Sequence, residues 1–232
     1  MDRTLSRQEA SDAVGDLGWR YLLDALRTSV PVTSLARATE VTGIAVAACE
    51  AHADGHLRVD VRADRVVLTL QSLDRATLTE RDTDLAHRIT AALRGIGLRT
   101  DPDLAGDAAR PVQMLEIAID ALDIPAIRPF WKAVLGYAAE PGADRPTDPL
   151  VDPVGQGPAV WFQQMDRPRP QRNRIHFDLC VPHDEATRRI QSALGAGGRL
   201  LSDVRAPAFW VLADVEGNEV CVTTWQGRDQ PW

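Results

Sequence analysis

Along the first part of the chain, the spacing of apolar residues is that of a helix in some segments and that of a strand in others. Ser6 followed three residues later by Glu9 forms a capping-box pattern, which predicts a short helix that ends near Gly15. Residues 19–30 alternate apolar with polar side chains and are followed by Pro31, which predicts one strand ending at that proline. The chain therefore begins with a helix and a strand.

The remaining elements of this part follow in the same way. Between residues 32 and 51 the apolar positions recur at three- and four-residue steps, which predicts a helix with one buried stripe. Alternating apolar residues between 59 and 70, interrupted at 63–65, predict two short strands. Thr79 then begins a helix that extends through Leu93. This order predicts an α+β domain in which helices cover one face of an antiparallel sheet.

The second half of the chain contains an internal repeat. Residues 114–120 and residues 174–180 each predict a strand that is followed by a helical run and then by further β-like segments. The repeat predicts paired βαβββ modules, in which Glu116 and His176 occupy equivalent places. Residues 95–111 are rich in Gly, Asp, Ala and Pro and have no apolar period, which is typical of a linker.

The domain boundaries follow from these two patterns. We expect a first domain over residues 1–98, a linker over 99–111 and a second domain over 112–232. A length of 232 residues allows each half to bury its own core.

Composition and charge narrow the classes of partner. The net charge of −7 argues against a protein that neutralises the phosphates of nucleic acid. The three cysteines, Cys49, Cys180 and Cys221, form no CxxC pair and fit a reducing cytoplasm. No apolar stretch has the length of a signal-peptide core or approaches the ~20 residues of a membrane span. We therefore expect a cytoplasmic protein with no nucleic-acid or membrane partner.

One motif in the first domain points to a family. Asp54-Gly55-His56-Leu57, the strands that follow and then Leu78-Thr79-Glu80-Arg81-Asp82 resemble the signature of pterin-4a-carbinolamine dehydratases. In that family an acidic residue, two adjacent histidines and a proline precede a strand, and a further histidine follows it. The second histidine of the pair falls on His56, whereas the first falls on Gly55, the proline on Leu57 and the later histidine on Leu73. The scaffold of the motif is present, and two of its three imidazoles are replaced.

The resemblance implies a hydro-lyase that needs no cofactor, acts on a small pterin and forms a homo-oligomer. Dehydration requires a proton for the departing hydroxyl and a base for the ring proton, and imidazole suits both roles. The catalytic candidates are His56, His52 and Asp54, and Asp82 is a candidate for substrate binding. Two simpler interpretations stand beside these: His56 is an exposed loop residue of a domain that has lost catalysis, and Asp82 with Thr79 is only a helix cap.

The second domain resembles the glyoxalase-like branch of the vicinal oxygen chelate superfamily over residues 112–226. The resemblance is carried by residues 130–137, 173–179 and 214–221 within the duplicated pattern. It implies a cupped sheet that binds a ligand or a divalent metal. An aromatic-sided pocket in this half has Trp161 and Trp210 as candidate lining residues.

The resemblance implies that metal ligands in such a cup would occupy the positions equivalent to the ligands of metal-dependent relatives. They fall on Glu116, His176 and Cys221, with Gln163 and Glu219 as further candidates. A cup without metal is the preferred interpretation, because the terminal glutamate of metal-dependent relatives has no counterpart at position 221.

The sequence thus favours a 4a-hydroxytetrahydropterin dehydratase, weakened by the replaced histidines and fused to a glyoxalase-like domain. The first alternative is an enzyme of lyase, isomerase or dioxygenase type whose chemistry lies in the second domain. The second alternative is a non-catalytic protein that binds a pterin or another small molecule. The segment between the two modules contains Arg167, Arg169, Arg172 and Arg174. Its simplest interpretation is an exposed connection, and the alternative is an anion-binding loop.

Overall fold

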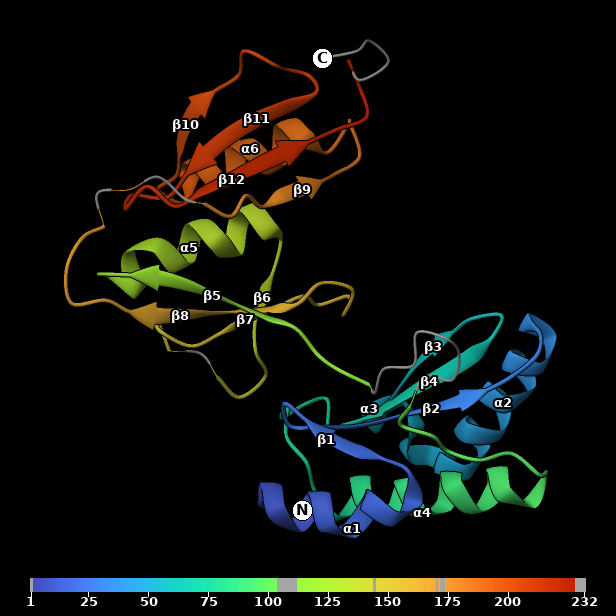
Figure 1. Cartoon of the computed structure of the whole chain (residues 1–232). Helices are drawn as coiled ribbons and strands as arrows, with labels where there is room; N and C mark the ends of the chain where they lie inside the picture. The colour runs from blue at the N-terminus through green and yellow to red at the C-terminus, as the bar shows by residue number, and fades with distance from the viewer. Residues whose placement is uncertain (1, 104–111, 144, 170, 172–173, 228–232) are drawn as a thin grey trace. The chain divides into compact units, whose positions relative to one another are not determined.

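The computed structural model describes residues 2–103, 112–143, 145–169, 171 and 174–227. The chain folds as two compact units, Met1–Met114 and Leu115–Trp232, which are described separately here (Figure 1). Of the expected linker over 99–111, residues 104–111 lie outside the described part of the chain. Within that part, none of the helices is both long enough and apolar enough to cross a membrane.

The first unit is built on a four-stranded antiparallel sheet. The strands are β1 (Arg20–Leu22), β2 (Ala25–Pro31), β4 (Arg65–Leu70) and β3 (Leu57–Val61), in this order across the sheet. The single strand predicted over residues 19–30 is wrong, because a tight turn divides it. Leu23 and Asp24 adopt positive φ angles of 46° and 56°, and the Tyr21 hydroxyl donates to the Asp24 carboxylate at 2.8 Å. Residues with side chains adopt this conformation rarely, so the alternating pattern gave no sign of the turn.

Helices cover one face of this sheet, as the sequence predicted. They are α1 (Arg7–Val14), α2 (Leu35–Cys49) and α4 (Glu80–Gly95), with the short helix α3 (Ala53–His56) and 3₁₀ turns at Gly15–Leu17 and Glu50–His52 (Figure 1). The core between the layers contains Leu26, Leu68 and Leu70 from the sheet and Val41 and Leu85 from the helices, all essentially without exposed surface. Alternate strand residues point to this face, and the helices bury their apolar stripes against it.

The second unit consists of the two predicted βαβββ modules. The first contains β5 (Glu116–Ala121), α5 (Ile124–Leu135), β6 (Ala138–Ala139), β7 (Leu150–Val151) and β8 (Ala159–Gln164); the second contains β9 (Asp178–Cys180), α6 (Ala186–Gly195), β10 (Arg199–Ser202), β11 (Phe209–Ala213) and β12 (Glu219–Thr223). The sheet orders are β5-β8-β7-β6 and β9-β12-β11-β10, and in both modules the first strand pairs in parallel with the last. The duplication seen in the sequence is therefore confirmed in the topology.

One apolar core joins the two modules. Phe130 and Trp131 on α5 pack in the same cluster as Leu212 of β11 and Val220 of β12. The indole N–H of Trp131 donates to the wholly buried carboxylate of Asp214 at 3.0 Å. A buried tryptophan needs such a partner, because an unpaired N–H in a core costs about 1–3 kcal/mol. The contact fixes α5 of the first module against the turn after β11 of the second.

The cap of α1 predicts a pH-dependent contribution to stability. Hydrogen bonds from the backbone and hydroxyl of Ser6, and then from Arg3, lower the pKa of Glu9 from 4.5 to about 2. The ionised side chain therefore favours the folded state above pH 4.5, and this contribution is lost as the pH falls from 4.5 toward 2. We expect Glu9→Gln to unfold at a lower urea concentration than the wild type at pH 7, and the two midpoints to converge below pH 3. Asp16→Asn, an exposed carboxylate that follows the same helix, is the control for loss of one charge; a wild-type-to-Glu9→Gln difference as large at pH 2 as at pH 7 would contradict the prediction.

Candidate functional site

A break after α2 places the histidines of the first unit. The helix ends at Cys49 because Glu50 adopts a positive φ of 52°, and the chain continues through the 3₁₀ turn Glu50–His52 into α3. His56 is the last residue of α3 and lies directly before β3. Helix α2 therefore does not continue through His52 to His56; a 3₁₀ turn and the short helix α3 follow it.

Asp82 connects the imidazole of His56 to the start of α4. Its Oδ1 lies 2.7 Å from Nδ1 of His56, and its Oδ2 is 2.8 Å from both the backbone N–H and the hydroxyl of Thr79. The hydroxyl of Ser72 also donates to Oδ2, at 3.1 Å. The Asp82 side chain is fully buried and that of His56 is 15% exposed. Asp82 is therefore a helix cap and the partner of a histidine at once, so the simpler interpretation of this residue and the functional one are compatible.

This contact determines what the imidazole can do. A carboxylate accepts hydrogen bonds and does not donate them, so Nδ1 of His56 carries a proton and donates it to Asp82. In neutral His56 the lone pair is then on Nε2, which can accept a proton from a ligand. In protonated His56 the same atom is a donor. The arrangement leaves one nitrogen available for acid or base chemistry.

The two positions that lack the family's other histidines lie beside His56. The backbone N–H of Leu73 donates to the carbonyl of Gly55 at 3.0 Å, and that of Gln71 donates to the carbonyl of His56 at the same distance. A Cβ atom built on Gly55 would meet no atom within 4 Å. The backbone therefore brings the three positions together, although a single imidazole occupies them.

His52 lies near His56 in a different chemical setting. The two rings are perpendicular, with centroids 6.3 Å apart. Nε2 of His52 is 2.9 Å from a guanidinium nitrogen of Arg81, which in turn pairs with Asp2 at 2.6 Å. Because arginine only donates, Nε2 of His52 accepts, and the proton of neutral His52 is on Nδ1. The hydrogen bond from Arg81 lowers the pKa of Asp2.

The candidate residues of the first unit form one cluster, with the exception of Asp54. The structure brings His56, Asp82 and His52 together, whereas Asp54 is exposed on α3 and makes no hydrogen bond or ion pair within the described residues. Sequence reasoning missed Ser72 and Arg81 as parts of this site. Arg81 directly precedes Asp82 in the motif and could have been found there, while Ser72 follows a strand with no recognisable signal.

The candidate tryptophans of the second unit point to different surroundings. On β8, Val160 and Phe162 belong to the core, so Trp161 between them lies on the opposite face of the sheet, with Gln163. Trp210 of β11 is paired with Val222 and packs against the core. The two tryptophans therefore do not line one pocket.

The candidate metal ligands are not assembled into a metal site. Glu116 is exposed on edge strand β5 of one sheet, and Cys221 and Glu219 are on β12 of the other. His176 is exposed before β9, and Gln163 hydrogen-bonds to the carbonyl of the next residue. Among the described residues, no three His, Cys, Asp or Glu side chains form a group that could hold a metal ion. In the register of β5 and β8, Glu116 is opposite Ala159 and Gln163 is opposite Asp120, so these two candidates lie four residues apart along the sheet.

Comparisons with known proteins find one family model for each half of the chain. Residues 3–92 match the family model described as Pterin 4 alpha carbinolamine dehydratase, and residues 116–223 match the one described as Glyoxalase-like domain. None of the curated proteins matches the chain.

Similar solved structures correspond to one half of the chain each. A transcriptional coactivator/pterin dehydratase from Brucella melitensis is 24% identical, covers 39% of this chain and 98% of its own, and has a TM-score of 0.35. A glyoxalase/bleomycin resistance protein/dioxygenase family enzyme from Burkholderia phytofirmans is 16% identical, covers 47% of this chain and 95% of its own, and has a TM-score of 0.39.

The contacts of Asp82 predict its effect on stability. In Asp82→Asn only one side-chain oxygen remains to accept, so Thr79 and a His56 ring protonated at Nδ1 cannot both keep their hydrogen bonds. We expect the free energy of unfolding to fall by about 1–3 kcal/mol, the usual cost of unpaired buried polar groups. Urea denaturation measures this change, and Asp84→Asn on the exposed side of the same helix is the matched control. Equal effects of the two substitutions would contradict the role given to Asp82.

Proposed function

We propose that the first domain, which matches the Pterin 4 alpha carbinolamine dehydratase model over residues 3–92, dehydrates a 4a-hydroxytetrahydropterin. The observation that carries the proposal is the His56 imidazole, which hydrogen-bonds through Nδ1 to the buried Asp82 and keeps Nε2 for the ligand. The helix cap at Thr79 needs Asp82 and does not need His56. An imidazole held in one orientation beside the family's other two positions is the feature that dehydration would use.

One imidazole can carry out both proton transfers that the dehydration requires. The bond between C4a and the hydroxyl oxygen breaks, the electron pair leaves with the oxygen, and a proton converts it to water. The proton on the adjacent ring nitrogen is removed, and its electron pair forms the double bond to C4a. A neutral His56 that takes the ring proton on Nε2 can return a proton to the leaving hydroxyl, so the histidine ends the cycle unchanged.

Gly55 and Leu73 limit the rate. Neither side chain can transfer a proton, so one imidazole serves in succession as base and as acid. Each positioned acid or base typically contributes about 10²–10⁴-fold to a rate. The expected enzyme is therefore active but slower than one with histidine at all three positions.

The first test is stopped-flow dehydration of a freshly generated 4a-hydroxytetrahydropterin. We expect the wild type to exceed the uncatalysed rate, and His56→Ala to lose this acceleration by about 10²-fold or to the uncatalysed level. His87→Ala, an exposed histidine on α4, is the control and should retain the wild-type rate. A wild-type rate equal to that without protein would refute the proposal; if the pterin still bound, the first domain would be a binding module.

A gain of activity tests the same geometry from the other side. Histidines introduced together at Gly55 and Leu73 would lie beside His56, and position 55 has open space for a side chain. We expect the double variant to dehydrate the pterin about tenfold faster or more, since each added imidazole can take one proton-transfer role. Circular dichroism verifies the fold, and the same pair of substitutions in a His56→Ala background separates cooperation with His56 from new chemistry. No increase in a folded double variant would show that the three positions do not form one site.

A further inference from the structure

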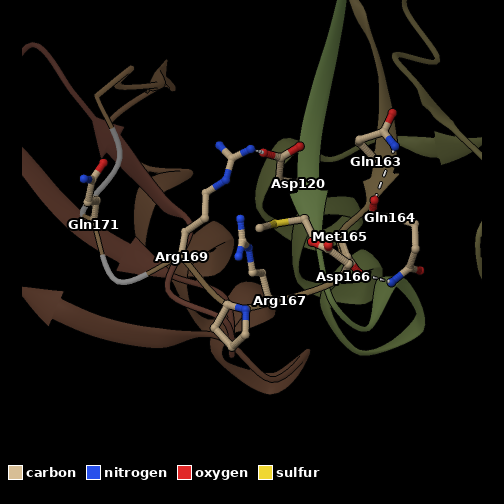
Figure 2. Close-up of a pocket in the computed structure, with 9 residues that line it drawn as sticks. Asp120, Gln163, Gln164, Met165, Asp166, Arg167, Arg169 and Gln171 are labelled. Atoms are coloured by element: carbon tan, nitrogen blue, oxygen red, sulfur yellow. Dashed lines mark hydrogen bonds and ion pairs between the residues drawn. The ribbon is translucent and has the colours of Figure 1, made fainter.

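The connection between the two modules of the glyoxalase-like domain forms one wall of a hollow. A space of about 720 Å³, here called the polar hollow, is lined by Asp120 of β5, Gln163 and Gln164 of β8, and Arg167 and Arg169 of the connection. Figure 2 shows both arginine side chains rising from the connection on the side of Asp120. Arg167 and Arg169 of the arginine-rich segment therefore face a hollow, whereas Arg172 lies outside the described residues.

A second space continues from the first. It measures about 570 Å³ and shares Asp120, Met165, Pro168, Arg169 and Gln171 with the polar hollow. Its other lining includes Trp131, Ile175 and Phe177, for which it is here called the apolar hollow. Both volumes fall within the roughly 300–1,000 Å³ of small-molecule sites. A ligand with one charged end and one apolar end would match the two hollows together.

Three carboxylates and three arginines line the two hollows, and they differ in how they are paired. Glu216 lines the apolar hollow, but its two oxygens accept the backbone N–H groups of Leu122 and Asp123 at 2.8 and 2.6 Å. Asp120 is paired with Arg169 at 2.7 Å, and that arginine side chain is 71% exposed. The carboxylate of Glu216 is therefore hydrogen-bonded to the backbone, and that of Asp120 is ion-paired with Arg169.

The remaining charges are mostly positive. Arg167 lines the polar hollow and Arg174 lines the apolar hollow, and neither makes an ion pair within the described residues. Asp166, next to Arg167 in the chain, is the one further carboxylate that lines either space. Arg167 and Arg174 thus line the hollows without an ion pair from the described residues, and their guanidinium groups can pair with an anionic ligand.

We propose that the glyoxalase-like domain binds a small organic carboxylate at this place, independently of the pterin chemistry of the first domain. The carboxylate lies in the polar hollow against Arg167 and the exposed side of Arg169, since a guanidinium offers paired N–H donors that match two carboxylate oxygens. The apolar body of the ligand extends past Met165 into the apolar hollow, toward Ile175 and Phe177. Each part of the ligand thus contacts a surface of its own kind.

The test uses benzoate and hexanoate as probes, each with its neutral amide, on the full chain. Isothermal titration calorimetry measures affinity, and ¹H–¹⁵N spectra locate the site through shifts at the amides of Ala118 and Met165. We expect both carboxylates to bind, each amide to bind at least about tenfold more weakly, and added sodium chloride to weaken the carboxylates.

Substitutions then assign the binding to the two arginines. Arg167→Gln should weaken carboxylate binding about tenfold, and Arg167→Gln with Arg169→Gln should weaken it further. Arg145→Gln, an exposed arginine of the same domain that lines neither hollow, removes the same charge and should leave the affinity unchanged. Failure of both carboxylates to bind, equal binding of the amides, or equal losses in Arg145→Gln and Arg167→Gln would overturn the proposal. None of these outcomes depends on whether the first domain dehydrates a pterin.

Discussion

The buried carboxylate of Asp82 is the constraint on which the first domain depends. A charged group without exposed surface is tolerated in a protein only when hydrogen bonds replace the water that it loses. Asp82 receives these bonds from Thr79, Ser72 and His56, which come from three separate segments of the chain. The start of α4, the turn after β4 and the end of α3 are therefore held to one point. The orientation of the His56 ring is a consequence of how the domain folds.

A second buried aspartate has the same role in the other domain. Asp214 has no exposed surface, and its oxygens accept from the backbone N–H groups of Glu216 and Asn218, from the Asn218 amide and from the Trp131 indole. These contacts shape the turn between β11 and β12 and attach it to α5. The same turn presents Glu216 to the start of α5, which is also an edge of the apolar hollow. Thus in both domains a buried carboxylate fixes the backbone next to the place where a ligand is proposed.

Much of the fold could be predicted because it depends on patterns that extend over many residues. The helix after Thr79 and the duplicated βαβββ order follow from repeated apolar positions, and both are found. The turn at Leu23 and Asp24 could not be predicted, because it depends on positive φ angles without glycine. The bond between His56 and Asp82 joins residues 26 positions apart, and no local pattern encodes such a distance. Likewise, strand period alone gave no means of separating Trp161, outside the core, from Trp210, packed against it.

Because Asp82 caps α4 as well as contacting His56, its presence in the dehydratase motif is not by itself evidence for catalysis. The segment from Thr79 to Asp82 is needed for the cap of α4, so a domain of this fold has a reason to contain it whether or not it catalyses a reaction. Gly55 and Leu73 are joined by a hydrogen bond between backbone atoms, which does not depend on their side chains, so the fold does not require imidazoles there. His56 differs from both cases. Its imidazole is only one of the several donors to Asp82, and the cap keeps its own bonds to Thr79 without it. The identity of residue 56 is therefore what folding explains least, and it is the strongest argument in this domain for proton-transfer chemistry.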